Sequence, residues 1–491
     1  MDILFGLFGL AVLIGIAWLF SLKRSAVDCQ LVVTGVALQV GFAACVLLGS
    51  RWVAWVERSV GADPTTDVIA TWLLVVVVIA VAGAVALVAS MRTPSLRRAG
   101  FGAIGLAVLL ALPFAGNIFE FLSQAFVKVL GFVNAGSNFI FGSLMDTSKF
   151  GFIFAFQVLP TIIFFAALMG VLYHLNVMQW IVRGMAWAIT KVMRVSGAET
   201  TSVCASVFIG QTEAPLTVRP YIPKMTESEL ITMMIGGMAH IAGGVLAAYV
   251  GMLGAGDPVA MQFYAKHLLA ASIMAAPATL VIAKLLVPET GEPLTRGTVK
   301  MEVEKTASNV IDAAAGGAAD GLRLALNIGA MLLAFIALIA LINWPLTWVG
   351  EATGLAAWLG KPTDLATIFG YVLAPLAWVI GVPWQDANTV GSLIGQKVVI
   401  NEFVAYLQLA EIVNGNVEGV TLTDKGRLIA TYALCGFANF SSIAIQIGGI
   451  GGLAPERRSD LARFGLRAVL GGSLATFMTA TIAGVLTSLG A

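Results

Sequence analysis

A short polar segment, residues 210–215, carries the side chains best suited to chemistry in this chain. It reads Gly-Gln-Thr-Glu-Ala-Pro and is flanked by the apolar stretches 203–209 and 230–253. A charged side chain at bilayer depth costs at least ~2.5 kcal/mol on insertion scales, so Glu213 is an expensive residue there. Broken backbone at that depth is tolerated where it lines a cavity, and a half-helix starting near Pro215 would aim free N–H groups into it. The segment therefore predicts a binding site for a polar solute.

Two further polar sets occur in apolar surroundings. Asn401 and Glu402 lie in the segment 387–408, and Asn439 lies with two serines in the segment 427–453. Carboxylate, amide and hydroxyl groups together offer the donors and acceptors that recognise the vicinal hydroxyls of a sugar. The alternative is structural: a buried network that fixes the backbone, with Asn439 acting as a helix cap.

His240 lies inside an apolar span, close to a Gly-Gly pair at 243–244. Histidine titrates near neutral pH, so a role in carrying a proton is one interpretation of this residue. Packing in the core is the other. The sequence has no metal-ligand spacing such as HExxH, and its four cysteines show no CxxC pattern, so no cofactor and no metal beyond a possible Na⁺ is expected.

The composition indicates a polytopic membrane protein. Of its 491 residues 59% are hydrophobic and 11% charged, and the mean hydropathy is +0.92. Soluble domains carry about 25% charged residues. A net charge of +1 argues against nucleic acid as a partner, because no basic surface is available to neutralise phosphates. No nucleophile with an acid–base pair and no ring of filter residues occurs, so neither an enzyme nor a channel is favoured.

The elements that must position the polar sets are helices in the bilayer. Amphipathic interfacial helices are expected at 116–133, 177–195 and 364–381, and hairpins that enter the membrane without crossing it at 197–222 and 387–408. The basic residues concentrate on one set of connections, which the positive-inside rule makes cytoplasmic, so both termini are expected on the periplasmic side. Spans of about 20 apolar residues are expected at 3–21, 30–50, 67–91, 99–115, 152–174, 229–253, 267–287, 322–343, 427–453 and 462–488.

The chain also contains a weak internal repeat. Residues 152–287 and 322–488 both run in the order span, interfacial helix, hairpin, broken span, span. Three crossings separate the two starts, so the repeats are inverted, as in many secondary transporters. The predicted fold class is an all-α polytopic membrane protein, an inverted-repeat transporter with two re-entrant hairpins and two broken transmembrane helices. Its expected divisions are N-terminal helices at 1–50, an inserted helix pair at 51–115, an interfacial helix and loop at 116–150, and repeats at 151–290 and 291–491.

Three motifs, in this order, carry a resemblance to a known family. They are the segments 210–216 (GQTEAPL), 401–406 (NEFVAY) and 435–444 (CGFANFSSIA). They are similar to the signatures of the concentrative nucleoside transporters, and the resemblance covers residues 130–491 closely and 1–50 loosely. It implies a homotrimer in the bacterial inner membrane, a scaffold with a mobile transport domain in each protomer, and uphill symport of nucleosides such as uridine, cytidine or adenosine.

The resemblance also implies residue roles. The nucleobase would contact Gln211, Thr212, Glu213 and Val245, and the ribose would contact Glu402, Asn439, Ser442 and Phe437. Where sodium-coupled relatives place their ion, this chain has Ser206, Ile209, His240 and Ile241. Imidazole is a poor ligand for Na⁺, which prefers oxygen, so coupling to H⁺ is favoured over Na⁺, with His240 or Glu213 as the proton carrier. An uncoupled facilitator and an integral membrane enzyme are the alternatives.

Overall fold

The computed structural model describes residues 2–60, 115–151, 153–297 and 307–488. These residues form helices, and the β contact among them is one isolated bridge between Ser196 and Arg296. The predicted spans 67–91 and 99–115, the core of the expected insertion 51–115, lie outside the described residues, apart from residue 115 itself. The helices are α1 (Asp2–Leu19), α2 (Cys29–Val60), α5 (Ala115–Phe141), α6 (Thr147–Phe150), α7 (Phe154–Gln157), α8 (Leu159–His174), α9 (Val177–Met193), α10 (Gly197–Ser206), α11 (Glu227–Ala239), α12 (Gly243–Gly254), α13 (Pro258–Leu286), α14 (Val310–Ala352), α15 (Leu355–Leu359), α16 (Leu365–Val379), α17 (Trp384–Val399), α18 (Glu402–Val413), α19 (Asp424–Ala433), α20 (Phe440–Leu453) and α21 (Arg458–Ser488), with the 3-10 turns η1 (Arg24–Ala26), η4 (Gly142–Met145), η5 (Ala214–Lys224) and η6 (Pro455–Arg457).

Several of these helices suit a bilayer. In the described part of the chain, 7 are long and apolar enough to cross a membrane, or 8 if α16 and α17, bent by 116° relative to each other, form one broken span. The predicted interfacial segment 116–133 belongs to the longer helix α5, which is among them. The segment 364–381 forms α16, which packs against α17. Apolar length therefore predicted where helices occur better than where they end.

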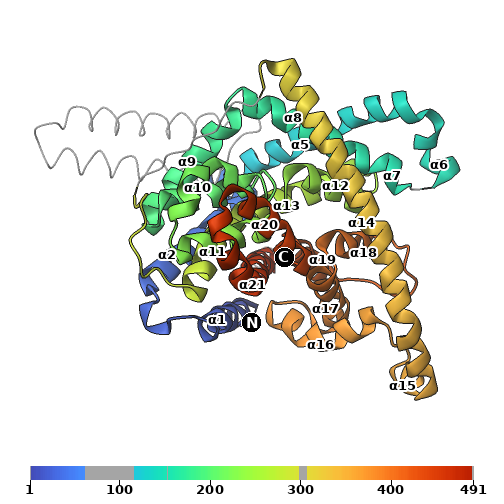
Figure 1. The fold of residues 1–491 in the computed structure, drawn as a ribbon. Helices are drawn as coiled ribbons and strands as arrows, with labels where there is room; N and C mark the ends of the chain where they lie inside the picture. Colours follow the sequence, from blue (N-terminus) through green and yellow to red (C-terminus); the bar gives the residue numbers. More distant parts are fainter. Residues whose placement is uncertain (1, 61–114, 152, 298–306, 489–491) are drawn as a thin grey trace, which may run out of the picture.

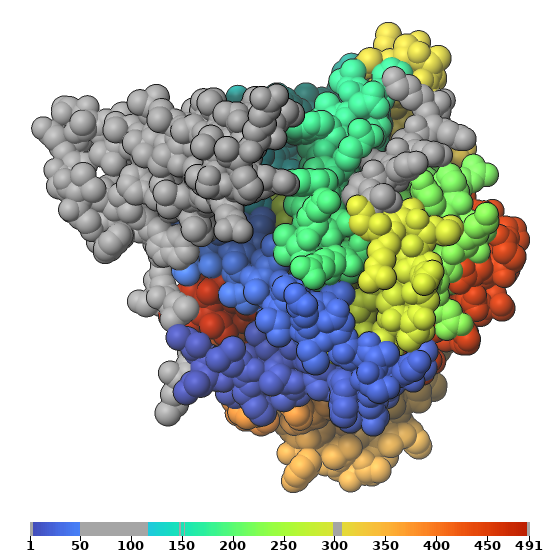
Figure 2. Space-filling model, turned by 90° about the vertical axis from the view of Figure 1, so that its left-hand side faces the viewer, coloured from blue at the N-terminus to red at the C-terminus, as the bar shows by residue number. Residues whose placement is uncertain are grey.

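Helix α21 forms the centre of the molecule (Figure 1). It packs against α11, α13, α19 and α20, and most of its side chains are buried. Helices α1 and α2 cover one face of this core, as Figure 2 shows in blue. A Cβ on Gly6 would touch Val485 and one on Gly9 would touch Thr481, so α1 and α21 run antiparallel. The start of α1 and the end of α21 consequently lie at the same end of the molecule.

Helix α14 is a long element along the edge of the molecule (Figure 1). Its 43 residues extend well beyond the predicted span 322–343. It packs closely along α8, because small residues at the crossing let the two backbones approach. A Cβ on Gly317 would lie 2.5 Å from the carbonyl oxygen of Ala166, and one on Gly321 would lie 2.8 Å from the Cα of Ile163. This contact requires glycine.

The crossing of α8 and α14 gives a test of packing. We expect Gly317→Ala to lower the free energy of unfolding by ~1–2 kcal/mol, because its new methyl group meets backbone atoms that cannot move aside. Gly316 is the matched control, since a Cβ there meets nothing within 4 Å. Gly316→Ala is expected to be neutral or stabilising, because alanine favours the helix. Thermal unfolding of the two purified variants in detergent makes the comparison, and equal midpoints would contradict the close crossing.

The expected half-helix near Pro215 has a different form. Residues Ala214–Lys224 form a 3-10 helix with a kink at Val218. Pro220 and Pro223 lie inside it, and proline neither donates a backbone hydrogen bond nor fits the interior of an α-helix. A helical segment therefore does start near Pro215, as the sequence predicts, but it is a kinked 3-10 helix and not an α-helix.

Both broken spans begin in the same way. Thr226 accepts a hydrogen bond from the backbone N–H of Glu229 at the start of α11 (3.1 Å), and Thr423 accepts one from Gly426 at the start of α19 (3.0 Å). A hydrogen bond to the preceding hairpin fixes the start of each broken span. Ser196, directly before α10, donates to Glu229 of α11 (2.5 Å), and Thr423, directly before α19, donates to Asp386 of α17 (2.5 Å). Each broken span thus starts with a capping threonine and is tied to the start of the preceding hairpin, which is what a repeated unit predicts.

Candidate functional site

Two hairpins and two helix breaks make up the site. Hairpin 1 is α10, the turn 207–213 and η5; hairpin 2 is α17 and α18. The first break, residues 240–242, separates α11 from α12, and the second break, residues 434–439, separates α19 from α20. The N–H of Gly243 donates to Phe208 of hairpin 1 (3.0 Å), and the N–H of Phe437 donates to His240 (3.3 Å). The two breaks are therefore in contact with each other, and the first is also tied to hairpin 1.

A group of amides lies where hairpin 1 approaches α20. Gln211 donates from Nε2 to the hydroxyl of Ser442 (3.0 Å), and Gln446 donates to Oε1 of Gln211 (3.1 Å) and to the carbonyl of Met234 (2.9 Å). A Cβ on Gly237 would lie 2.7 Å from Nε2 of Gln446, so only glycine leaves room for these amides. Gln446 was missed by the sequence analysis, although it follows Ser442 by four residues and thus shares its helix face.

A carboxylate centre lies beside this group. Asn439 donates from Nδ2 to Oε2 of Glu402 (2.9 Å), and the hydroxyl of Tyr249 donates to Oε1 (3.3 Å). The side-chain oxygen of Asn439 also accepts from the backbone N–H of Ser442 (2.9 Å). Asn439 therefore has both of the roles that the sequence left open: it caps α20, and it holds the carboxylate. Tyr249, which stacks on Tyr406 at 4.2 Å between ring centroids, was not predicted.

These contacts join into one hydrogen-bonded network. It runs from Tyr249 through Glu402, Asn439 and Ser442 to Gln211 and Gln446. Its members come from hairpin 1, hairpin 2, α12, the second break and α20. A polar network of donors and acceptors, buried among apolar helices, is suited to binding a polar solute by replacement of its internal bonds.

Four of the predicted substrate residues, three for the nucleobase and Phe437 for the ribose, lie outside the network. Thr212 donates to Glu213 (3.0 Å), and Glu213 is exposed. Its carboxylate folds over Gly210, where a Cβ would lie 2.2 Å from Oε2. Val245 is buried in the first turn of α12, and Phe437 is half-buried in the second break. None of these side chains has a described hydrogen bond to Gln211.

The four residues predicted to act on the coupling ion lie at hairpin 1 and the first break. Ser206 donates to the carbonyl of Ser202 (3.0 Å), Ile209 is half-buried and Ile241 is buried. His240 ends α11 and contacts the carbonyl of Gly236 through Nδ1 (2.7 Å). A carbonyl only accepts, so Nδ1 carries hydrogen. Nε2 is buried and has no hydrogen-bond partner among the described residues.

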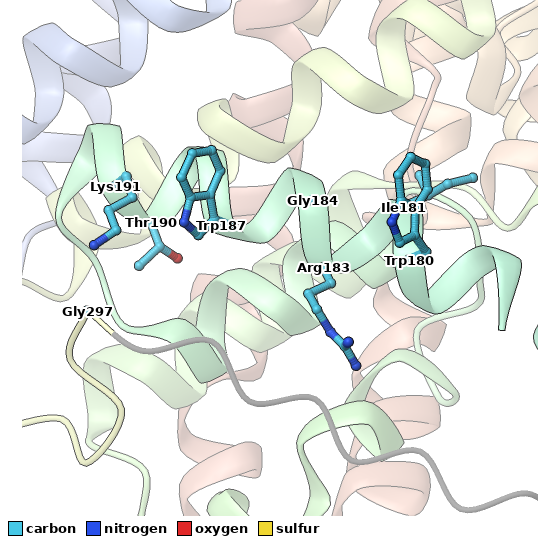
Figure 3. A pocket seen from close by; sticks show the side chains of 8 residues that line it. All are labelled: Trp180, Ile181, Arg183, Gly184, Trp187, Thr190, Lys191 and Gly297. Atoms are coloured by element: carbon cyan, nitrogen blue, oxygen red, sulfur yellow. The ribbon is translucent and has the colours of Figure 1, made fainter. Parts of the chain in front are cut away.

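A surface hollow lies on α9, and Figure 3 shows the side chains that line it, none of which belongs to the network. Trp180, Arg183, Trp187 and Lys191 line it, and the two tryptophans are 79% and 60% exposed. The opposite face of α9 is buried. The segment 177–195 is thus an amphipathic helix, as predicted, with exposed aromatic and basic side chains of the kind that suit a membrane interface.

Three family models match the chain. One described as the N-terminus of a Na⁺-dependent nucleoside transporter matches residues 8–61, one described as nucleoside recognition matches residues 155–256, and one described as the C-terminus of the Na⁺-dependent nucleoside transporter matches residues 267–484. Together they include both hairpins and both breaks.

Relatives are similar over long stretches. An uncharacterized transporter of Haemophilus influenzae is 42% identical over 494 residues, 100% of this chain and 99% of the relative. Mouse sodium/nucleoside cotransporter 1 is 39% identical over 378 residues, 75% of this chain and 56% of the relative. The solved structure of CNTnw in an inward-facing substrate-bound state is 40% identical, with a TM-score of 0.77 and coverage of 100% and 99%. A CNTnw variant in an outward-facing state has the same score, 0.77.

Proposed function

Because the chain belongs to the concentrative nucleoside transporter family, we propose that its buried polar network binds a nucleoside and that a cation gradient drives the uptake. The chain is an integral membrane transporter and not an enzyme. The observation that carries the proposal is the continuous chain of hydrogen bonds from Tyr249 to Gln446. It brings Gln211, Glu402 and Ser442, which come from three separate parts of the sequence, to one place.

Each part of the network suits one part of a nucleoside. The Glu402 carboxylate, next to Asn439 and Ser442, can accept from the vicinal hydroxyls of ribose, with Phe437 against the sugar. The Gln211 amide offers both a donor and an acceptor to a nucleobase such as that of uridine, cytidine or adenosine. Thr212, Glu213 and Val245 complete this half of the site. Gln211 and Ser442 are hydrogen-bonded to each other (3.0 Å), and the substrate would replace this bond with its own contacts to both residues.

Membership of the family also suggests how the protein moves its substrate. Each protomer of a homotrimer in the bacterial inner membrane would move its hairpins and broken spans across the bilayer against a fixed scaffold. Large apolar side chains exposed on α14, including Leu326, Leu333 and Trp344, supply a surface for contact with neighbouring protomers or lipid. Both chain ends would face the periplasm, in agreement with the antiparallel packing of α1 on α21.

We favour H⁺ as the coupling ion. The buried and unpartnered Nε2 of His240, at the first break, is a place where a proton can bind. Ser206 is the one side-chain oxygen among the four predicted ion-site residues, and it donates within its own helix. The family models and the mouse relative are named for Na⁺, so the choice of ion needs a direct test.

That test is uptake of radiolabelled uridine into proteoliposomes, with an inward H⁺ gradient and an inward Na⁺ gradient imposed separately. Accumulation driven by the H⁺ gradient alone supports the proposal. Accumulation driven by Na⁺ alone would show that backbone carbonyls and Ser206 suffice for the ion, and that His240 has another role. Equilibration without accumulation under either gradient would indicate an uncoupled facilitator.

A single substitution tests the account of the ion site. We expect His240→Ser to give uptake that responds to a Na⁺ gradient, because a hydroxyl replaces the imidazole beside the carbonyl groups of the first break. His267→Ser is the control: His267 is also buried, but it contacts the hydroxyl of Tyr432 (3.1 Å) from α13. Uptake by His240→Ser that is indifferent to Na⁺ would count against this assignment.

A further inference from the structure

Lys397, in the last turn of α17, has an unusual environment. Its side chain is fully buried. Among the described residues, no carboxylate oxygen lies within 4.0 Å of its Nζ, the distance limit for an ion pair. Its Nζ donates to the carbonyl of Ala433 (2.8 Å) and to the hydroxyl of Thr476 (3.0 Å), and lies 5.7 Å from the centre of the Phe477 ring. Burial of an unpaired ammonium is costly, so its surroundings must offset that cost in another way.

Lys284, the other buried lysine among the described residues, is stabilised in the usual way, by carboxylates. Lys284 in α13 is paired with the carboxylate of Glu199 at 2.7 Å and with that of Glu289 at 3.5 Å. Lys397 instead has a carbonyl, a hydroxyl and an aromatic face. These groups are the ligands of a cation site and not the partners of an ordinary ion pair.

The carbonyl group that holds Lys397 has a particular position. Ala433 is the last residue of α19, directly before the second break. The carbonyls at a helix C-terminus lack partners and carry the negative end of the helix dipole. The hydroxyl of Thr476 donates to the carbonyl of Ser473 (2.9 Å), so it presents a lone pair to Lys397. Both oxygen atoms therefore attract a positive charge.

Hairpin 2 thus places a positive charge at the helix end before the second break and a negative charge at the helix start after it. Lys397 meets the C-terminal end of α19, and Glu402 meets Asn439, the cap at the N-terminal start of α20. Each charge has the sign that its helix end favours. At the first break the end of α11 is formed by His240, and no lysine or arginine from the described part of hairpin 1 is bonded there.

We propose that the ammonium of Lys397 is a tethered cation, which fills at the second break the position that a mobile coupling ion takes at the first. It neutralises the end of α19 and keeps Glu402 and Asn439 placed for ribose. The inference rests on the proposed function, and it makes a distinct claim: nucleoside binding needs a positive charge at this point, whichever molecule supplies it.

Chemical rescue tests this claim. Uridine binding to the purified protein in detergent is measured by calorimetry, which needs no ion gradient. Lys397→Ala leaves a cavity and is expected to bind uridine about 30-fold more weakly, the effect of a favourable partly buried charge at a helix end. Added ammonium or methylammonium is expected to recover most of that loss. Lys397→Met, which fills the cavity without a charge, is expected to bind weakly and not to be rescued.

Two outcomes would overturn the proposal: uridine binding by Lys397→Met at the wild-type affinity, or weak binding by Lys397→Ala that neither amine improves. If the variants do not fold, both are expressed and purified with methylammonium present throughout. Recovery of folded Lys397→Ala but not of Lys397→Met then supports the tethered cation, and recovery of neither counts against it. Wild-type protein that fails to bind any nucleoside would instead refute the proposed function.

Discussion

Replacement of Glu402 by glutamine is expected to weaken uridine binding by about 100-fold, equivalent to ~2.7 kcal/mol, the contribution of a hydrogen bond to a charged group. The fold around the residue should persist. The amide oxygen of the new side chain can accept from Nδ2 of Asn439, and its NH₂ group then faces the hydroxyl of Tyr249, which can rotate to accept. What disappears is the negative charge and the ability to accept from two ribose hydroxyls.

Two comparisons make this result specific. Glu411→Gln changes another carboxylate of α18, outside the network, and is expected to leave the affinity unchanged. Binding of 2′-deoxyuridine, which lacks one hydroxyl group, is expected to be weakened less by Glu402→Gln than binding of uridine. Calorimetry on the purified proteins measures all of these affinities. An unchanged affinity for uridine in Glu402→Gln would rule out the ribose contact.

The residue types and their order along the chain were enough to predict the centre of the site. A carboxylate or amide in an apolar span is costly, so Gln211, Glu402 and Asn439 were conspicuous in the sequence. Their mutual contacts agree with the prediction that these sets act together. Tyr249 and Gln446 were not predicted. Tyrosine is common in apolar helices, and which helix face meets which neighbour is set by tertiary packing and not by local pattern.

Some features of the fold could likewise be predicted from the sequence, and others could not. Hydropathy predicted the helices because the bilayer sets their length, and the breaks at 240–242 and 434–439 followed from glycine and polar residues. The extent of α14 and the 3-10 form of η5 were not predicted. The first depends on packing against α8, and the second on three prolines whose combined effect on the backbone is hard to judge from spacing alone.

The two roles of Asn439 can be separated by a pair of substitutions, with an effect on binding as large as that of Glu402→Gln. Asn439→Leu removes both the cap of α20 and the donor to Glu402. Loss of a cap costs ~1 kcal/mol and loss of a charge-assisted hydrogen bond ~1.5–3 kcal/mol, so we expect uridine affinity to fall by about 100-fold and the unfolding temperature to fall as well.

Asn439→Ser supplies the comparison, because serine is a good helix cap but is too short to reach the carboxylate. If Asn439 acts only as a cap, the serine variant should bind uridine like the wild type and be equally stable. If the donor to Glu402 matters for the substrate, the serine variant should keep most of the stability and still bind weakly. We expect the second result, since a carboxylate left without its 2.9 Å partner is free to turn away from the ribose. Calorimetry and thermal unfolding of the same preparations would distinguish the two roles.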